Sequence, residues 1–416
     1  MLILVETNKH TTQRFLNAKP DLPSDREKVT HQLRTTKMFL DKKTPLVAVD
    51  ISAHSVVIAQ LKQVKDRLEL MSLGSRSLGE GCVIDGAIER PGEVVDALRQ
   101  LLKTEEIKTR HAVTSLHGDA AIIKKIETPV MSEEELAENI GKEAEQHIPF
   151  DVSDVRFDFQ IIGPVQNERN GEDSLAGWEG FAEEEMMEVL IIAALNEVVD
   201  SRFDILTEAG LRPVILDIDI LAAANALNFT TDLSTMGPVA LVDLGDPLTQ
   251  VSVLNNGVTS FARETPVHGT CHSSWITTQF RLPFERITKT KQRKTSENLG
   301  EEPAIWEGTE WEKLLVDDSE KKLSLKTVVA EMERVFTLFT EDTNEPIKRI
   351  FICGIGTLVS EVDALLAGYF KVPVEIINPF KSIKVNPKRF NHETLNIFGS
   401  LATVPIGLAT RRFDYE

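Results

Sequence analysis

The sequence predicts a mixed α/β fold divided into two lobes, and two similar hairpins are the main reason. Each hairpin is an apolar strand ending in an aspartate, then a turn of small residues and a second strand: LVAVD-ISAHS-VVIAQL at 46–61 and VALVD-LGDPLT-QVSVLNNG at 239–257. A third element, IFICGIGTLV at 350–359, is a strand followed by a glycine turn. Because 416 residues are too many for one ordinary core, we expect two lobes with one hairpin each.

The composition is typical of a globular protein with a strong negative charge. Hydrophobic residues make up 42% of the chain and charged residues 27%, and the net charge is −19. This charge disfavours nonspecific binding to nucleic acid and direct docking on anionic lipid. The scattered Cys82, Cys271 and Cys353 leave at least one thiol unpaired, which favours a reducing cytoplasm over a disulfide scaffold.

The sequence also suggests how the chain would reach a membrane. It contains no apolar run near the roughly 20 residues that a membrane-spanning helix needs. The start, MLILVETNKHTTQRF, has no basic region before its apolar patch and so does not resemble a secretory signal. We therefore expect membrane association only through a partner, and we expect the polar residues 1–44 to form a mobile tail.

Strands and helices follow in order along the first lobe. Strands are expected at 46–50, 56–61, 68–73, 112–116 and 120–126, with a helix at about 91–103. The best-specified element is a helix capped by Ser132, because Glu135 completes a capping box and Met131 and Leu136 occupy the positions of a hydrophobic staple. This helix must end before Pro149.

The remaining elements are predicted in the same way. Strands are expected at about 156–162, 188–195, 214–220 and 350–353, and helices at 196–210, 221–227, 325–340 and 402–411. The strand 188–195 is almost wholly apolar, so it should be central and covered on both faces. Two polar segments, about 163–186 and about 290–322, are predicted to be mobile.

The two hairpins favour a nucleotide cleft. Carboxylates can hold the water shell of Mg²⁺, a task for Asp50 and Asp243. Tight turns present backbone N–H groups to phosphate, a task for Ser52 and Ser55 in the first lobe, Gly245 and Thr249 in the second, and the turn at Gly354 and Gly356. The alternative is that Asp50 and Asp243 only form turns at strand ends.

Other kinds of chemistry find little support. The nine histidines lack metal-ligand spacing, and His268 and His272 have no carboxylate nearby in the sequence. No nucleophile, P-loop lysine or dinucleotide motif occurs, so we nominate no catalytic residue.

The corner EAEQHIPFD at 143–151 has two interpretations. Ile148, Pro149 and Phe150 could edge a groove that receives an extended apolar peptide. Alternatively, Ile148 and Phe150 simply pack under their own helix.

Taken together, these residues resemble the PilM family of type IV pilus assembly from about Leu46 to Arg411. The most specific segments are MSEEELAENIGKEAEQHIPFDVSDVRFDFQ at 131–160 and EVLIIAALNEVVDSRFDILTEAGLRPVILDIDILAAANAL at 188–227. ALVDLG at 240–245, INPF at 377–380 and PIGLATR at 405–411 agree in order and spacing.

The resemblance implies an actin-like (ribonuclease H-like) two-lobed α/β fold with an FtsA-type inserted subdomain in the first lobe. The implied division is a tail at 1–44, a first-lobe core at 45–79 and 187–237, an inserted subdomain at 80–186, a second-lobe core at 238–268 and 346–416, and a second-lobe subdomain at 269–345. It also implies ATP and Mg²⁺ between the lobes, and capture of the cytoplasmic N-terminal peptide of the membrane protein PilN beside the inserted subdomain. It adds Gly269, Lys291 and Thr357 to the candidate nucleotide-binding residues.

Departures from the family pattern fall mainly on the nucleotide site. Ser52 replaces a glycine, Val57 a lysine and Thr288 an acidic residue, while Gly354-Ile355-Gly356-Thr357 replaces a glycine-rich run. A Cβ at Ser52 would obstruct the approach of the backbone to phosphate if that residue needs a positive φ. These changes predict weak ATP binding with little or no turnover.

The resulting hypothesis is a cytoplasmic adaptor, peripheral at the inner membrane. It would bind a PilN-like peptide and could also contact pilus assembly motor ATPases or form oligomers. Two alternatives stay open: an active ATPase or kinase of the same fold, and an FtsA-like cytoskeletal or cell-division protein.

Overall fold

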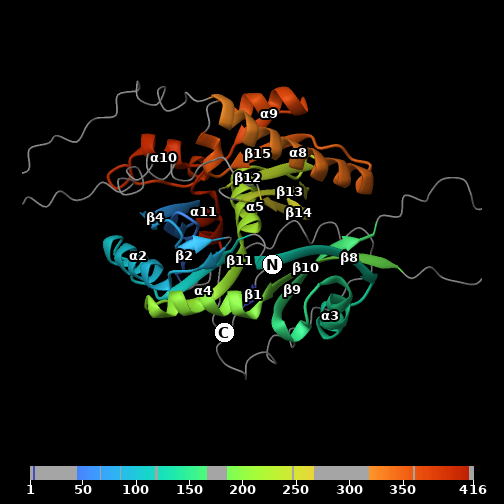
Figure 1. The fold of residues 1–416 in the computed structure, drawn as a ribbon, viewed down its shortest axis with the longest axis horizontal. Helices are drawn as coiled ribbons and strands as arrows, with labels where there is room; N and C mark the ends of the chain where they lie inside the picture. The colour runs from blue at the N-terminus through green and yellow to red at the C-terminus, as the bar shows by residue number, and fades with distance from the viewer. Residues whose placement is uncertain are drawn as a thin grey trace, which may run out of the picture.

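The computed structural model describes the chain in segments, shown as coloured ribbon in Figure 1. They are residues 3–4, 45–65, 67–84, 86–117, 120–165, 185–245, 248–266, 318–358 and 361–411. Two large sheets and a smaller one account for most of the strands in these segments.

A six-stranded sheet forms the first lobe, in the order β1-β11-β7-β2-β3-β4. Its strands are β1 (Ile3–Leu4), β11 (Arg212–Ile218), β7 (His111–Leu116), β2 (Val47–Ile51), β3 (Ser55–Val64) and β4 (Arg67–Ser77). β11, β7 and β2 are parallel, whereas β2, β3 and β4 form an antiparallel meander. The short strands β5 (Val83–Ile84) and β6 (Ala87–Ile88) pair separately.

The two faces of this sheet bury different helices. Val47, Val49 and Ile51 of β2 pack against α2 (Pro91–Thr104) and α4 (Asn196–Glu208). Ala48 points the other way, into the cluster that holds α5 (Asp219–Thr230) and α11 (Thr403–Ala409). Since side chains alternate along a strand, Asp50 belongs to the α5 and α11 side.

A five-stranded sheet forms the second lobe, in the order β14-β13-β12-β15-β16. Its strands are β12 (Val239–Leu244), β13 (Leu248–Asn255), β14 (Val258–Pro266), β15 (Arg349–Cys353) and β16 (Val374–Ile376). α8 (Asp318–Thr343) and α9 (Val362–Phe370) cover one face, and α5 contacts the other. Helix α5 therefore lies between the two large sheets, as Figure 1 shows.

A three-stranded antiparallel sheet, β8-β10-β9, carries helix α3. The elements are β8 (Ala121–Pro129), α3 (Glu133–His147), β9 (Val155–Pro164) and β10 (Met186–Leu195). The predicted capping box of α3 is present: the Glu135 N–H donates to Ser132 Oγ at 3.2 Å, and the Ser132 N–H donates to Glu135 Oε2 at 2.9 Å. In β10, Val189 and Ile191 face α3 while Ile192 faces the first-lobe core, so both faces are covered as predicted.

The predicted inserted subdomain at 80–186 does not coincide with any one sheet of the structure. β7 and α2 fall within that range but belong to the first-lobe sheet and its core. β10, assigned by sequence to the first-lobe core, is instead the middle strand of the small sheet. An apolar strand covered on both faces has the same pattern in either sheet, so the sequence could not separate them.

Short C-terminal elements complete the second half of the chain. They are the 3-10 helices η5 (Ile355–Leu358) and η6 (Pro379–Lys381) and the helix α10 (His392–Phe398). Another 3-10 helix, η3 (Val152–Asp154), precedes β9.

None of the helices in the described segments has the combination of length and hydropathy needed to cross a bilayer.

The predicted mobile segments fall mostly outside the described residues. The two ends of the segment 163–186 lie in strands β9 and β10, and two further exceptions correct the prediction. Ile3–Leu4, within the expected tail, pair antiparallel with Ile215 and Leu216 at the edge of the first-lobe sheet. Helix α8 begins at Asp318, so the end of the expected insertion 290–322 is helical.

Helices α11 and α5 cross so closely that Gly407 cannot carry a side chain. A Cβ at Gly407 would run into the backbone carbonyl of Ala222. We therefore expect Gly407→Ala to reduce the free energy of unfolding by about 1–3 kcal/mol, measured by urea denaturation.

Gly368→Ala in α9 is the matched control, because its Cβ would meet nothing within 4 Å. This substitution should be neutral or stabilise by about 0.5–1 kcal/mol, since alanine favours a helix over glycine. Equal denaturation midpoints for the two variants would contradict the close crossing.

Candidate functional site

A cleft opens between the two aspartate hairpins. It is lined by residues of the β2–β3 turn, the β12–β13 turn, the turn after β15 and the start of α11. Of the predicted residues, six line it: Asp50, Ser52, Ser55, Asp243, Gly245 and Gly354. Thr249, Gly356 and Thr357 are not among its lining residues, and Gly269 and Lys291 lie outside the described segments, as does Thr288.

The first hairpin closes through its two serines. The Ser52 N–H donates to the Ser55 carbonyl at 2.9 Å, and the Ser55 N–H donates to Ser52 Oγ at 3.2 Å. Ser52 is not among the described non-glycine residues with positive φ, so the strain considered for a side chain at this position does not arise. The Ser52 hydroxyl instead holds the turn together.

The second hairpin needs glycines at its points of closest approach. Gly354 has φ +82°, and a Cβ there would collide with Asp243 Oδ1 and the Leu244 carbonyl. A Cβ on Gly245 would collide with the Leu248 carbonyl. Gly354 therefore lets the turn after β15 pass directly over Asp243, and Gly245 lets the β12–β13 turn close tightly.

Thr357 has a structural role in the same turn. Its hydroxyl lies 2.7 Å from the Gly354 carbonyl and 2.6 Å from Ser400 Oγ, and its side chain is buried. The predicted contact between Thr357 and a nucleotide would require these bonds to break.

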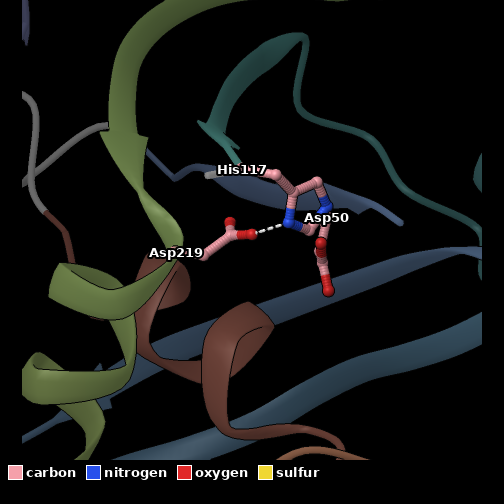
Figure 2. A group of neighbouring side chains, drawn as sticks. All are labelled: Asp50, His117 and Asp219. Carbon is pink, nitrogen blue, oxygen red and sulfur yellow. Dashed lines mark ion pairs between the residues drawn. The ribbon is translucent and has the colours of Figure 1, made fainter. Parts of the chain in front are cut away.

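A buried charge cluster forms the floor of the cleft. His117 directly follows β7, and its Nδ1 is ion-paired with Asp219, the first residue of α5, as Figure 2 shows. Asp50 lies beside this pair. The Ile51 carbonyl accepts two hydrogen bonds, from His117 Nε2 at 2.8 Å and from the buried Arg202 at 3.2 Å.

Burial and mutual repulsion shift the protonation of this cluster. Burial, followed by the charge of Asp219, raises the pKa of Asp50 to about 7. Burial and Asp219 likewise raise the pKa of Asp243 to about 6. Burial alone would lower the pKa of His117, but the Asp219 carboxylate outweighs it and raises that pKa to about 9.

The lining of the cleft is acidic. Asp50, Asp219 and Asp243 all contribute, and no lysine or arginine is among the described lining residues. Two buried atoms at this surface, Asp219 Oδ1 and Gln250 Oε1, have no hydrogen-bond partner within the described segments. Such a surface suits a cation, or an anion that arrives with one.

Sequence reasoning missed His117, Asp219 and Arg202. The histidines had been set aside for lack of metal-ligand spacing, yet folding brings His117 beside two aspartates. A usable signal existed: His117 and Asp219 directly follow the neighbouring parallel strands β7 and β11, and ligand sites form at the carboxyl ends of such strands.

The proposed peptide corner is only partly available to a ligand. Ile148 is 8% exposed and packs in the core beneath α3, so its assignment to the rim of a groove needs correction. Phe150 is 40% exposed, and Pro149 is exposed as well. Ile148 is the C-cap of α3, and its N–H donates to the Ala144 carbonyl.

The α5 helix between two sheets, with an aspartate hairpin from each lobe facing one cleft, defines an actin-like two-lobed fold. The model of the family described as type IV pilus assembly protein PilM matches residues 48–413. The chain therefore belongs to this family and is an actin-like protein of type IV pilus assembly.

One solved structure agrees with this assignment of the fold. A structure titled "PilM-PilN type IV pilus biogenesis complex" is similar at a TM-score of 0.69 and 23% identity, covering 88% of this chain and 98% of that one. Weaker similarity extends to the ethanolamine utilization protein EutJ from Carboxydothermus hydrogenoformans, with a TM-score of 0.44 and 14% identity over 88% of this chain and 89% of that one.

The His117–Asp219 pair predicts a stability that depends on pH. Because folding raises the pKa of His117 from 6.5 to about 9, its contribution is present below pH 6.5 and is lost as the pH rises toward 9. The free energy of unfolding of the wild type should fall over this window, measured by urea denaturation at a series of pH values.

His117→Gln is the matched variant, since it keeps a polar side chain but cannot become charged. Its unfolding free energy should decline less between pH 6.5 and 9 than that of the wild type. Parallel curves for the two proteins would show that His117 does not carry the effect.

Proposed function

We propose that this chain is a cytoplasmic adaptor that captures a short, extended, apolar peptide from a PilN-like inner-membrane protein. The protein contact would hold the adaptor at the membrane, where it could also meet the assembly motors. The solved structure similar to this chain contains PilM and PilN, which supports this choice of partner. The net charge of −19 favours attachment through a protein rather than through anionic lipid.

The arrangement of sheet edges is the observation that carries this proposal. β11 is next to the edge of the six-stranded sheet, and β9 is an edge of the small sheet. Residues Ile3–Leu4 form a strand that pairs with β11 and also contacts β9. This site therefore accepts an extended segment, and backbone pairing of this kind is a common way to bind a peptide.

We further propose that the cleft between the hairpins binds a nucleotide weakly and hydrolyses it little. Asp50 and Asp243 would hold the water shell of Mg²⁺, and the unpartnered Gln250 Oε1 could accept a hydrogen bond from the nucleotide. The nucleotide would need Mg²⁺ in order to bind in the cleft, because the acidic lining would repel bare phosphates. The buried Val57, where the family pattern has lysine, supplies no positive charge to offset that repulsion.

Asp243→Asn tests the nucleotide part, because it removes one carboxylate while keeping the shape of the side chain. We expect Mg-ATP to bind about tenfold more weakly, a loss of about 1.4 kcal/mol, in calorimetric titration. Unchanged Mg-ATP affinity in Asp243→Asn, or tight binding with rapid turnover by the wild type, would contradict the proposal.

Phe150→Glu tests the peptide part, since Phe150 is exposed and its loss leaves no core cavity. We expect this change to abolish binding of the PilN-like N-terminal peptide, measured by fluorescence anisotropy, while the melting temperature stays unchanged. Phe229→Glu, at a comparably exposed phenylalanine on α5, is the control and should bind as the wild type does. Normal binding by a folded Phe150→Glu protein would place the groove elsewhere.

A further inference from the structure

Three side chains from separate elements converge on the floor of the cleft. Asp50 is the last residue but one of β2, His117 follows β7 and Asp219 begins α5. One potential ligand atom from each lies within 4.8 Å of the other two. Figure 2 shows the Asp219 carboxylate directed at the His117 ring, with Asp50 next to that ring. Two carboxylates and one imidazole form a donor set that suits a metal ion.

The backbone fixes which nitrogen of His117 is available. Its Nε2 lies 2.8 Å from the Ile51 carbonyl, which can only accept a hydrogen bond, so Nε2 carries a hydrogen. Nδ1 is therefore the atom that faces Asp219. Histidines that ligate metals commonly donate their other ring N–H to a backbone carbonyl, which orients the ring.

Asp219 supplies the second, independent observation. Its side chain is 2% exposed and lines the cleft, yet Oδ1 has no hydrogen-bond partner within the described segments. The ion pair with His117 uses only the other oxygen. A buried carboxylate oxygen without a partner is costly, and coordination to a cation would remove that cost.

We propose that Asp50, His117 and Asp219 directly bind a divalent first-row transition-metal ion, through one oxygen of each carboxylate and His117 Nδ1, which releases its proton to solvent and gives up its ion pair with Asp219 as the ion binds. Zn²⁺ and Mn²⁺ represent this class, because imidazole suits the former and carboxylate both. Mg²⁺ prefers oxygen ligands and its own water shell, so it fits this set less well. Three protein ligands leave coordination positions open toward the cleft.

This site goes beyond the proposed Mg-nucleotide function, since it needs no nucleotide. Asp50 is common to both sites, so a bound transition metal would alter how the cleft receives Mg-ATP. His117 and Asp219 belong to the metal site alone, whereas Asp243 belongs to the nucleotide site alone. Their variants therefore separate the two functions.

The test is a calorimetric titration of the metal-free, full-length protein with Zn²⁺ alone. We expect one ion per chain, an increase in melting temperature on binding, and at least a tenfold loss of affinity in His117→Gln. Co²⁺ titration should give visible absorption bands in the wild type that the variant lacks. His111→Ala, at the other end of β7 and away from the cleft, should bind Zn²⁺ like the wild type.

Two results would overturn the proposal: no Zn²⁺ binding by the wild type, or equal binding by the wild type and a folded His117→Gln. Either would mean that the pair of His117 and Asp219 is an ion pair only. Asp219→Asn provides a second variant if His117→Gln unfolds, and it should also lose Zn²⁺ binding. Mg-ATP titration of the same proteins shows separately whether the nucleotide function stands.

Discussion

The burial of charged groups where the two lobes meet is the constraint on which this structure depends. Asp50, His117, Asp219 and Arg202 come from four different segments of the first lobe, and their charges interact. Their mutual neutralisation requires β2, β7, α4 and α5 to keep fixed positions. Since isolated buried charges are strongly unfavourable, the cluster couples the packing of the first lobe to the shape of the cleft.

The same constraint shapes the opposite wall of the cleft. Asp243 is the last residue but one of β12, and Gly354 passes over it with a positive φ and a closeness that a Cβ would prevent. Gly407 similarly allows α11 to press against α5, whose first residue is Asp219. Close backbone packing thus positions both carboxylates, and it leaves an acidic cleft that favours cations over bare anions.

Local signals in the sequence predicted local structure well. The capping box at Ser132 and the apolar run of β10 each correspond to the expected element, because neighbouring residues determine them. The two hairpins and the placement of Asp50 and Asp243 in one cleft also followed from the pattern. The sequence pattern could not predict which sheet β10 joins, because central strands of antiparallel and parallel sheets have the same apolar pattern.

The site itself depends on contacts between distant parts of the chain. His117 and Asp219 meet only because β7 and β11 are adjacent, which no spacing between histidines could reveal. Ile148 looked available for a ligand, but its side chain packs in the core beneath α3.

Hydrogen exchange with and without Mg-ATP tests the central claim most directly. The account predicts slower exchange together in the segments around Asp50, Asp243 and Gly354, because one cleft unites them. Protection of only one segment, or of none at saturating nucleotide, would contradict it.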